Sequence, residues 1–116
     1  MTHHAGHHNQ EMQQCIRDCL DCAQVCTETI AHCLTLGGPH AAPEHIGLMQ
    51  SCSELCNVSA SAMMRHTEGH QAICGACAEI CRRCADSCAQ LGSDEGMTRC
   101  VVACRRCEES CQKMAA

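Results

Sequence analysis

Aromatic residues are absent: the 116-residue sequence contains no Phe, Tyr or Trp. The core therefore lacks its usual bulky fillers, and stacking platforms for single-stranded nucleic acid are missing too. Basic residues are also few, since eight Lys and Arg stand against thirteen Asp and Glu, giving a formal charge of -5. That balance excludes the basic surface that binds DNA or RNA. No apolar run approaches the roughly 20 residues that span a membrane, so we expect neither nucleic acid nor a membrane as a partner.

The N-terminal residues, MTHHAGHHNQ, are polar and rich in His. A secretory signal would carry an apolar stretch at this place. We therefore expect a cytoplasmic protein whose thiols are kept reduced. Residues 1–9 are expected to form a flexible His-rich tail, followed by one domain over residues 10–116.

Breaks in the sequence divide residues 10–116 into four helical segments. Gly37 suits the end of the first helix and Pro43 the first turn of the second. Further breaks at Gly69 and Gly92 separate the third and fourth, and Ser93 is the expected N-cap of the fourth. Because short connections make successive helices antiparallel, the sequence predicts an all-α, up-down-up-down four-helix bundle. The expected helices cover about 10–36, 43–66, 70–91 and 94–114.

Cysteine is abundant, with 16 residues placed at steps of three and four along the expected helices. Such steps keep side chains on one helix face, which in a bundle is the face that turns inward. These cysteines are Cys15, Cys19, Cys22, Cys26, Cys33, Cys52, Cys56, Cys74, Cys77, Cys81, Cys84, Cys88, Cys100, Cys104, Cys107 and Cys111. The same steps pass through His45, Met49, Met63, His66, His70 and Met97. The sequence thus predicts a core lined with sulfur, and these residues are its candidate metal ligands.

Two interpretations need no metal. Buried cysteine can act as a small apolar residue, but sixteen on the inward faces, with Ala and Ile mostly used elsewhere, exceed that role. Disulfides need an oxidising compartment and a specific placement of the Cβ atoms. Neighbouring thiols on one helix do not provide that placement, so both interpretations are disfavoured.

Metal binding explains the pattern best. Thiols three or four residues apart lie about 5 to 6 Å apart on a helix, so one ion can bridge them. Thiolates with thioethers select Cu(I), and about one Cu(I) per Cys would neutralise sixteen buried thiolates. About four tetrahedral Zn²⁺ would leave roughly eight negative charges, and iron–sulfur clusters usually use cysteines borne on loops. The sequence therefore favours multiple Cu(I) ions, with zinc or another soft metal as the alternative.

The repeated spacing C-x₃-C-x₂-C-x₃-C over residues 15–26 and 100–111, and its extended form over 74–88, resembles that of the bacterial four-helix-bundle copper storage proteins. The run CGACAEICRRC over residues 74–84 and the pair His32-Cys33 fit the same family. The resemblance covers nearly the whole chain after the tail. It implies storage of Cu(I) in the cytosol and a tetramer of bundles. Copper chaperones or copper enzymes would then be partners.

The antiparallel order gathers further soft ligands at the two ends of the bundle. One end collects Cys33, His45, Met49, Cys88, Met97 and Cys100; the other collects Met12, Cys15, Met63, His66, His70, Cys74, Cys111 and Met114. Met and His bind Cu(I) without losing a proton at neutral pH, which suits capture and release. The resemblance implies copper uptake at the first end, where the loop over 37–43 also opens more readily than packed helices.

A thiol redox enzyme or sensor is the alternative from another class. Such a protein needs one exposed thiol of low pKa beside a partner. The many near-equivalent buried thiols offer no distinguishable nucleophile, and no catalytic triad or phosphate-binding loop stands out. We therefore expect a protein that is not an enzyme.

Overall fold

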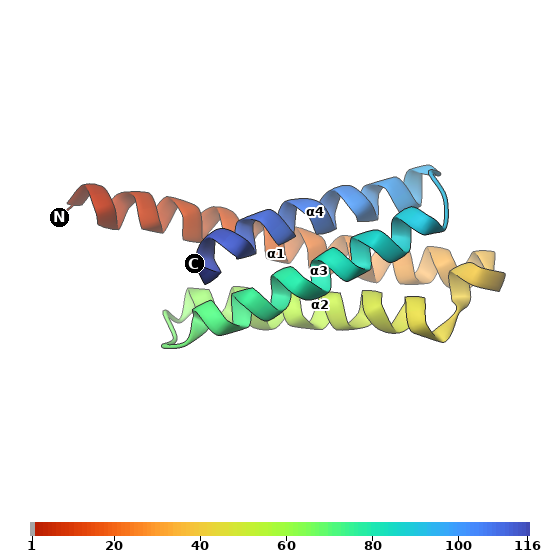
Figure 1. Cartoon of the computed structure of the whole chain (residues 1–116), viewed down its shortest axis with the longest axis horizontal. Coiled ribbons are helices and arrows are strands. Elements are labelled where there is room, and N and C mark those ends of the chain that lie inside the picture. The colour runs from red at the N-terminus through yellow and green to blue at the C-terminus, as the bar shows by residue number, and fades with distance from the viewer. Residues whose placement is uncertain (1) are drawn as a thin grey trace.

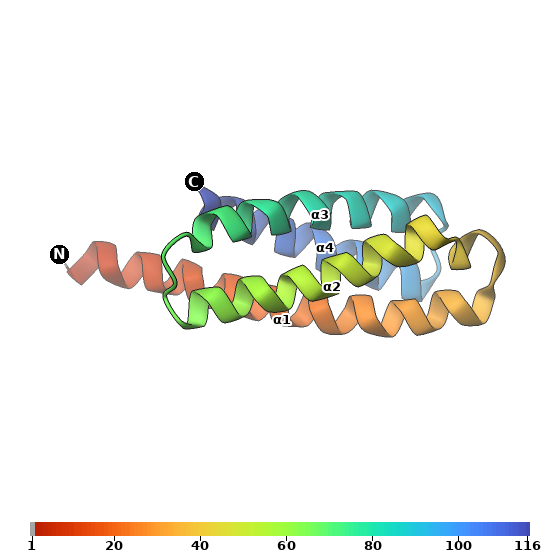
Figure 2. The same ribbon diagram turned by 90° about the horizontal axis from the view of Figure 1, so that it is seen from below.

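In the part of the chain that the structure describes, four α-helices run alternately up and down, and the predicted all-α four-helix bundle is confirmed. The computed structural model describes the backbone from residue 2 to 116 and the side chains from residue 9 onward. The helices are α1 (Thr2–Leu36), α2 (Pro43–Met64), α3 (His70–Gln90) and α4 (Glu95–Ala115), with the short 3₁₀-helix η1 (Gly38–Ala41) before α2. Each helix packs against the next, and α4 returns to α1 (Figures 1 and 2).

The helix boundaries agree closely with the prediction except at the N-terminus. α1 begins at Thr2, eight residues before the expected start at Gln10, so the helix runs through most of the segment 1–9. The expected flexibility of that segment stays a prediction, and the side chains of its His pairs lie outside the described residues. Within the described chain, no helix combines the length and the apolar character needed to cross a bilayer.

The connection between α3 and α4 corrects one predicted cap. Asp94, and not Ser93, is the N-cap of α4, and its carboxylate accepts a hydrogen bond of 2.9 Å from the backbone N–H of Met97. The helix starts one residue later than expected, which moves the cap position onto Asp94. Its carboxylate also lies 3.1 Å from Nε2 of His32, so the cap joins the start of α4 to the end of α1.

The end of α2 corrects a second expectation. The helix stops at Met64, and His66 adopts a left-handed conformation with a φ of 53°, where its N–H donates to the carbonyl of Met63. The side chain of His66 is exposed. The prediction that His66 continues the inward face of α2 is therefore wrong, because the helical period that placed it there ends two residues earlier.

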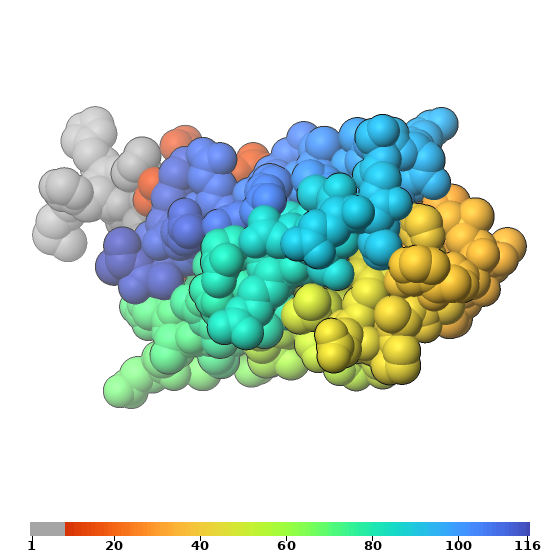
Figure 3. Space-filling view, turned by 45° about the vertical axis from the view of Figure 1, so that its right-hand side comes forward, coloured from red at the N-terminus to blue at the C-terminus, as the bar shows by residue number. Residues whose placement is uncertain are grey.

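The core is made of sulfur-bearing side chains, as the spacing predicts. Every cysteine is at most 1% exposed, and Met49, Met63 and Met97 are fully buried beside them. His45 and His70 are buried as well. Charged side chains lie outside, where Arg105 of α4 contacts Asp86 of α3 at 2.6 Å. On the face seen in Figure 3, side chains of α2, α3 and α4 meet and cover this core.

Candidate metal centre

The sulfur atoms form a continuous string along the bundle. Steps of three and four place cysteines on the inward face of each helix, and packing brings these faces together. Successive Sγ atoms along the string lie 3.3 to 4.0 Å apart. In order, the string passes through Cys15, Cys111, Cys19, Cys107, Cys56, Cys81, Cys52, Cys22, Cys104, Cys100 and Cys88. All sixteen cysteines are free thiols, so every sulfur of the string is a candidate ligand for a soft ion.

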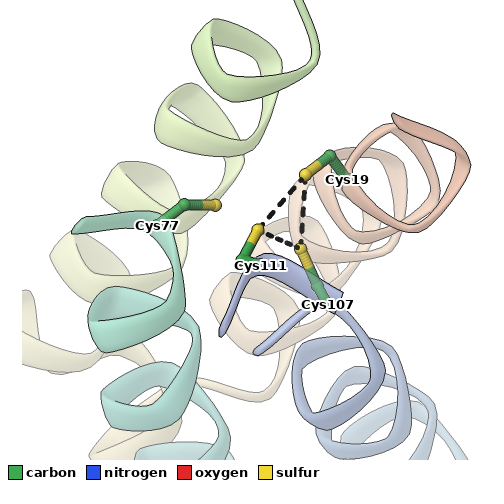
Figure 4. Close-up of side chains that lie close together, drawn as sticks. All are labelled: Cys19, Cys77, Cys107 and Cys111. Atoms are coloured by element: carbon green, nitrogen blue, oxygen red, sulfur yellow. Dashed lines mark hydrogen bonds between the residues drawn. The ribbon is translucent and has the colours of Figure 1, made fainter. Parts of the chain in front are cut away.

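Groups of four thiols within this string could each hold a metal ion. In one group, shown in Figure 4, Cys19 of α1 faces Cys107 and Cys111 of α4, and Cys77 of α3 points toward them from across the core. The Sγ atom of Cys19 lies 3.6 Å from that of Cys107 and 3.6 Å from that of Cys111. All four sulfur atoms lie within 4.8 Å of one another, so a single ion could contact several of them.

Neighbouring groups share their sulfurs. Cys22 and Cys52 belong both to the group with Cys26 and Cys104 and to the group with Cys56 and Cys81. A separate tetrahedral zinc site would need four sulfurs of its own. Shared sulfurs instead suit thiolates that bridge several monovalent ions. The geometry therefore favours a chain of linked sites over four independent ones.

Cysteines outside the string lie at its flanks. Cys84 belongs to a four-sulfur group with Cys26, Cys100 and Cys104. Cys74 lies toward the other end of the bundle, with its Sγ 3.3 Å from the hydroxyl of Ser59. The structure thus brings the sequence-predicted thiols together along the whole core.

A mixed set of ligands lies near the first connection, and we call it the α1–α2 end site. It consists of Cys33, His45 and Met97, contributed by α1, α2 and α4. The Sγ of Cys33 lies 3.3 Å from Nε2 of His45 and 3.7 Å from Sδ of Met97. Three soft ligand atoms from three helices can hold one Cu(I). Met49 is fully buried in the same core.

The sequence did not single out Ser87, which orients the histidine of this site. The hydroxyl of Ser87 lies 2.8 Å from Nδ1 of His45. With Nδ1 donating to this hydroxyl, the lone pair of Nε2 faces Cys33, as in metal sites whose ligating histidine is held through its other nitrogen. The spacing of three and four residues passes through Cys88 and not through Ser87, which precedes it. Nothing in the sequence pairs Ser87 with His45.

Burial sets the protonation of the α1–α2 end site. Burial raises the pKa of the Cys33 thiol to about 11, with the nearby Cys100 adding to the effect. Burial also lowers the pKa of His45 from its ordinary value. At neutral pH, Cys33 is therefore a thiol and His45 a neutral imidazole, so the histidine can bind an ion at once while the cysteine must first lose a proton.

Interactions between neighbouring thiols shift their pKa values in the middle of the core. The neighbouring thiols, Cys107 foremost, lower the pKa of Cys77 to about 3. Hydrogen bonds with neighbouring thiols raise the pKa of Cys56, with Cys107 as the largest cause. A thiolate that accepts from its neighbours is stabilised while the donors hold their protons. Neighbouring thiols in the core therefore differ in how readily each loses its proton to bind an ion.

The remaining predicted ligands lie at the other end of the bundle. Met63 is fully buried there, and His70 is buried at the start of α3. The exposed His66 is the one predicted ligand that the structure does not bring to the core.

Comparison with known proteins agrees with this geometry. The sequence profile of the family described as copper storage protein matches residues 8–116. A crystal structure of the Nmul_A1745 protein from Nitrosospira multiformis is 42% identical, with a TM-score of 0.87, covering 92% of this chain and 96% of that chain. The Cu(I)-bound copper storage protein BsCsp3 of Bacillus subtilis is 30% identical, with a TM-score of 0.84, covering 91% and 99%.

A third structure, a cytosolic copper storage protein from Streptomyces lividans loaded with five coppers, is 33% identical. Its TM-score is 0.82, and the match covers 95% of this chain and 96% of that chain. The profile match spans nearly the whole chain, and the sulfur-lined four-helix core has the same fold as these proteins. The chain therefore belongs to the copper storage protein family.

Proposed function

We propose that this protein stores Cu(I) in the cytoplasm, holding many ions through the thiolates of its core. The observation that carries the proposal is the string of shared sulfurs between Cys15 and Cys88, with steps of at most 4.0 Å. Relatives described as a Cu(I)-bound storage protein and as a cytosolic storage protein support both the metal and the compartment. The ion is cargo and undergoes no reaction, so we propose no enzymatic activity.

Charge balance supports a high capacity. If all sixteen free cysteines bind ions as thiolates, they carry sixteen negative charges in a core of low dielectric constant, and these charges must be neutralised. One monovalent ion for each bridging thiolate removes the net charge. We therefore propose a capacity on the order of one Cu(I) per Cys.

Capture and release are assigned to the α1–α2 end site. His45 and Met97 offer ligand atoms that need not lose a proton, and Cys33 lies in contact with both. An ion bound there reaches the string near Cys100 and Cys88, whose sulfurs are 3.3 Å apart. It then moves by exchange between neighbouring sulfurs, each thiol releasing its proton as it becomes a ligand. Release follows the same path in reverse, to a copper chaperone or a copper enzyme.

An anaerobic titration tests the proposal. Cu(I), delivered as a chelate with a competing chromogenic ligand, should be taken up tightly to well above ten ions per chain, following the charge-balance estimate. Cys52→Ala, which removes a shared sulfur, should lower the capacity by about one ion. Ser51→Ala, at the exposed neighbouring position, is the matched control and should leave it unchanged. Saturation at about four ions, with zinc competing effectively, would contradict copper storage and favour zinc.

We also propose that the chains assemble as a tetramer. Large apolar side chains remain exposed on the outside of the single bundle: Leu20, Leu34, Leu36, Val58, Met64 and Val102. Contact between bundles would remove part of this surface from water. Sedimentation should then give a particle of four chains of 12.5 kDa each.

A further inference from the structure

His70 has a buried ring nitrogen with no hydrogen-bond partner among the described residues. Its side chain is 8% exposed, and Nε2 is the one buried side-chain nitrogen or oxygen of the described chain without a partner. Leaving a buried polar atom unpaired is costly, so such an atom calls for an explanation. An ion that the ring nitrogen binds would supply one.

The other ring nitrogen determines what Nε2 can do. Nδ1 of His70 lies 2.9 Å from the backbone carbonyl oxygen of Thr67. A carbonyl can only accept, so Nδ1 carries the proton, and Nε2 of the neutral ring presents a lone pair. This arrangement, with Nδ1 fixed by a carbonyl, is the one found in histidines that bind metals through Nε2.

The residues at the level of His70 along the bundle carry thioethers. Four residues form the last layer of thiols and hydroxyls at this end. In it, the Sγ of Cys15 lies 3.6 Å from the Sγ of Cys111, and the hydroxyl of Ser59 lies 3.3 Å from the Sγ of Cys74. One helical turn outward from each of these residues, on the same face, lies the next layer. That layer consists of Met12 on α1, Met63 on α2, His70 on α3 and Met114 on α4.

The three methionines of this layer are at most 3% exposed and belong to the same core cluster. The layer lies at the end of the bundle where α2 turns into α3 and α4 terminates (Figures 1 and 2). It is thus the end opposite the α1–α2 end site. No cysteine belongs to it.

We infer that Nε2 of His70, with thioether sulfur from this layer, forms a second Cu(I) site that uses no thiol. Thioether and neutral imidazole are soft enough to select Cu(I), and neither loses a proton on binding. The site lies one turn from Cys15 and Cys111, where the sulfur string begins, and one turn from Cys74 at its flank. The inference rests on the proposed function for the identity of the ion, and it adds a binding site at the opposite end of the core.

Nitrogen-15 NMR of the histidine side chains tests this inference on the full, unmodified chain. Cu(I) is added anaerobically as a chelate from the apo state to saturation. The Nε2 resonance of His70 should shift from its value in the metal-free chain to that of a metal-bound nitrogen. A resonance that stays unmoved at saturation overturns the inference, whatever the variants do.

Two variants provide a matched comparison. His70→Gln should lower the copper capacity by about one ion, whereas His66→Gln, at the exposed histidine of the same turn, should leave it unchanged. The near-ultraviolet absorbance of Cu(I)–thiolate reports the core separately and should stay the same in both. Full capacity in a folded His70→Gln variant overturns the second site alone, while a wild-type chain without thiolate absorbance overturns the proposed function itself.

Discussion

The imidazole of His45 is held at both of its nitrogens. Ser87 contacts Nδ1 at 2.8 Å, and Cys33 lies 3.3 Å from Nε2. The hydroxyl thus fixes which nitrogen faces the sulfur. A ligand that is already oriented loses less freedom when an ion binds.

Ser87→Ala should weaken copper binding at the α1–α2 end site. The variant leaves the buried Nδ1–H without its acceptor and the ring free to turn, which typically costs about 10-fold or more in metal affinity. Total capacity should stay the same, because no sulfur is lost. Competition with a chromogenic chelator, followed over the whole titration to saturation, measures the change. Ser87→Thr keeps the hydroxyl and should restore the affinity; equal affinities in Ser87→Ala and wild type would contradict the role of Ser87.

The protonated state of Cys33 predicts proton release on copper uptake. Burial raises the pKa of Cys33 to about 11, so below that pH the group is a thiol and must lose a proton to bind Cu(I). Each unit of pH increase raises the thiolate fraction about tenfold, so the affinity of this site should rise with pH by the same factor. A pH indicator in weak buffer counts the protons released. Cys33→Ser should release about one proton fewer at saturation; an unchanged count would contradict this.

At the scale of the elements, the helix ends show where local sequence signals compete. Asp94 and Ser93 are both good N-cap residues, and only the start of α4 at Glu95 assigns the cap to Asp94. His66 lies in step with the inward face of α2, yet its left-handed backbone ends that face. Such ends depend on where the chain must turn to reach the next helix.

Asp94→Ala should destabilise the bundle, lowering Tm by about a few degrees. The hydrogen bond from the backbone of Met97, followed by that from His32, lowers the pKa of Asp94. A lowered carboxyl pKa gives stability above the unfolded value of about 4 and loses it as the pH falls through the folded value. The difference from wild type should therefore be present at neutral pH and shrink below about pH 4.

Ser93→Ala is the matched control for this cap. The hydroxyl of Ser93 does not accept the capping hydrogen bond that Asp94 accepts. The backbone carbonyl of residue 93 accepts a hydrogen bond from the hydroxyl of Thr98, and the variant keeps this bond. Thermal unfolding followed by circular dichroism measures both variants. If Asp94→Ala and Ser93→Ala lower Tm equally, the carboxylate cap of Asp94 does not contribute the predicted stability.

At the scale of the whole molecule, we expect the bundle to be folded before copper binds and to be more stable against unfolding afterwards. Aliphatic residues such as Ile16 and Val25 are buried beside the thiols and pack the helices without an ion. An ion that binds only the folded chain adds stability, about 2.7 kcal/mol for a site with free ligand at a hundred times its Kd. The apo chain should thus be helical, and loading should raise Tm.

Removal of copper with a strong chelator should return Tm to the apo value. Circular dichroism at the helical minimum, before and after loading, separates folding from stabilisation. A chain that is unfolded when apo would mean that the metal, and not helix packing, holds the bundle together.

The four helices, their antiparallel order and the inward position of every cysteine follow from the sequence alone. These properties are local, because steps of three and four place side chains on one helix face whatever lies opposite. Short connections then leave few ways to arrange the helices. The burial of His45, Met49, Met63, His70 and Met97 follows from the same rule and is confirmed.

The tertiary structure alone decided which atoms meet. The sharing of Cys22 and Cys52 between two groups depends on how far each helix slides along its neighbour. The contact of Ser87 with His45 joins residues that are 42 positions apart. The unpaired nitrogen of His70 likewise appears only once the turn before α3 is in place. The sequence spacing determines which face of a helix a side chain lies on. The axial register between helices determines which side chains meet on that face, and this register depends on packing along the whole core.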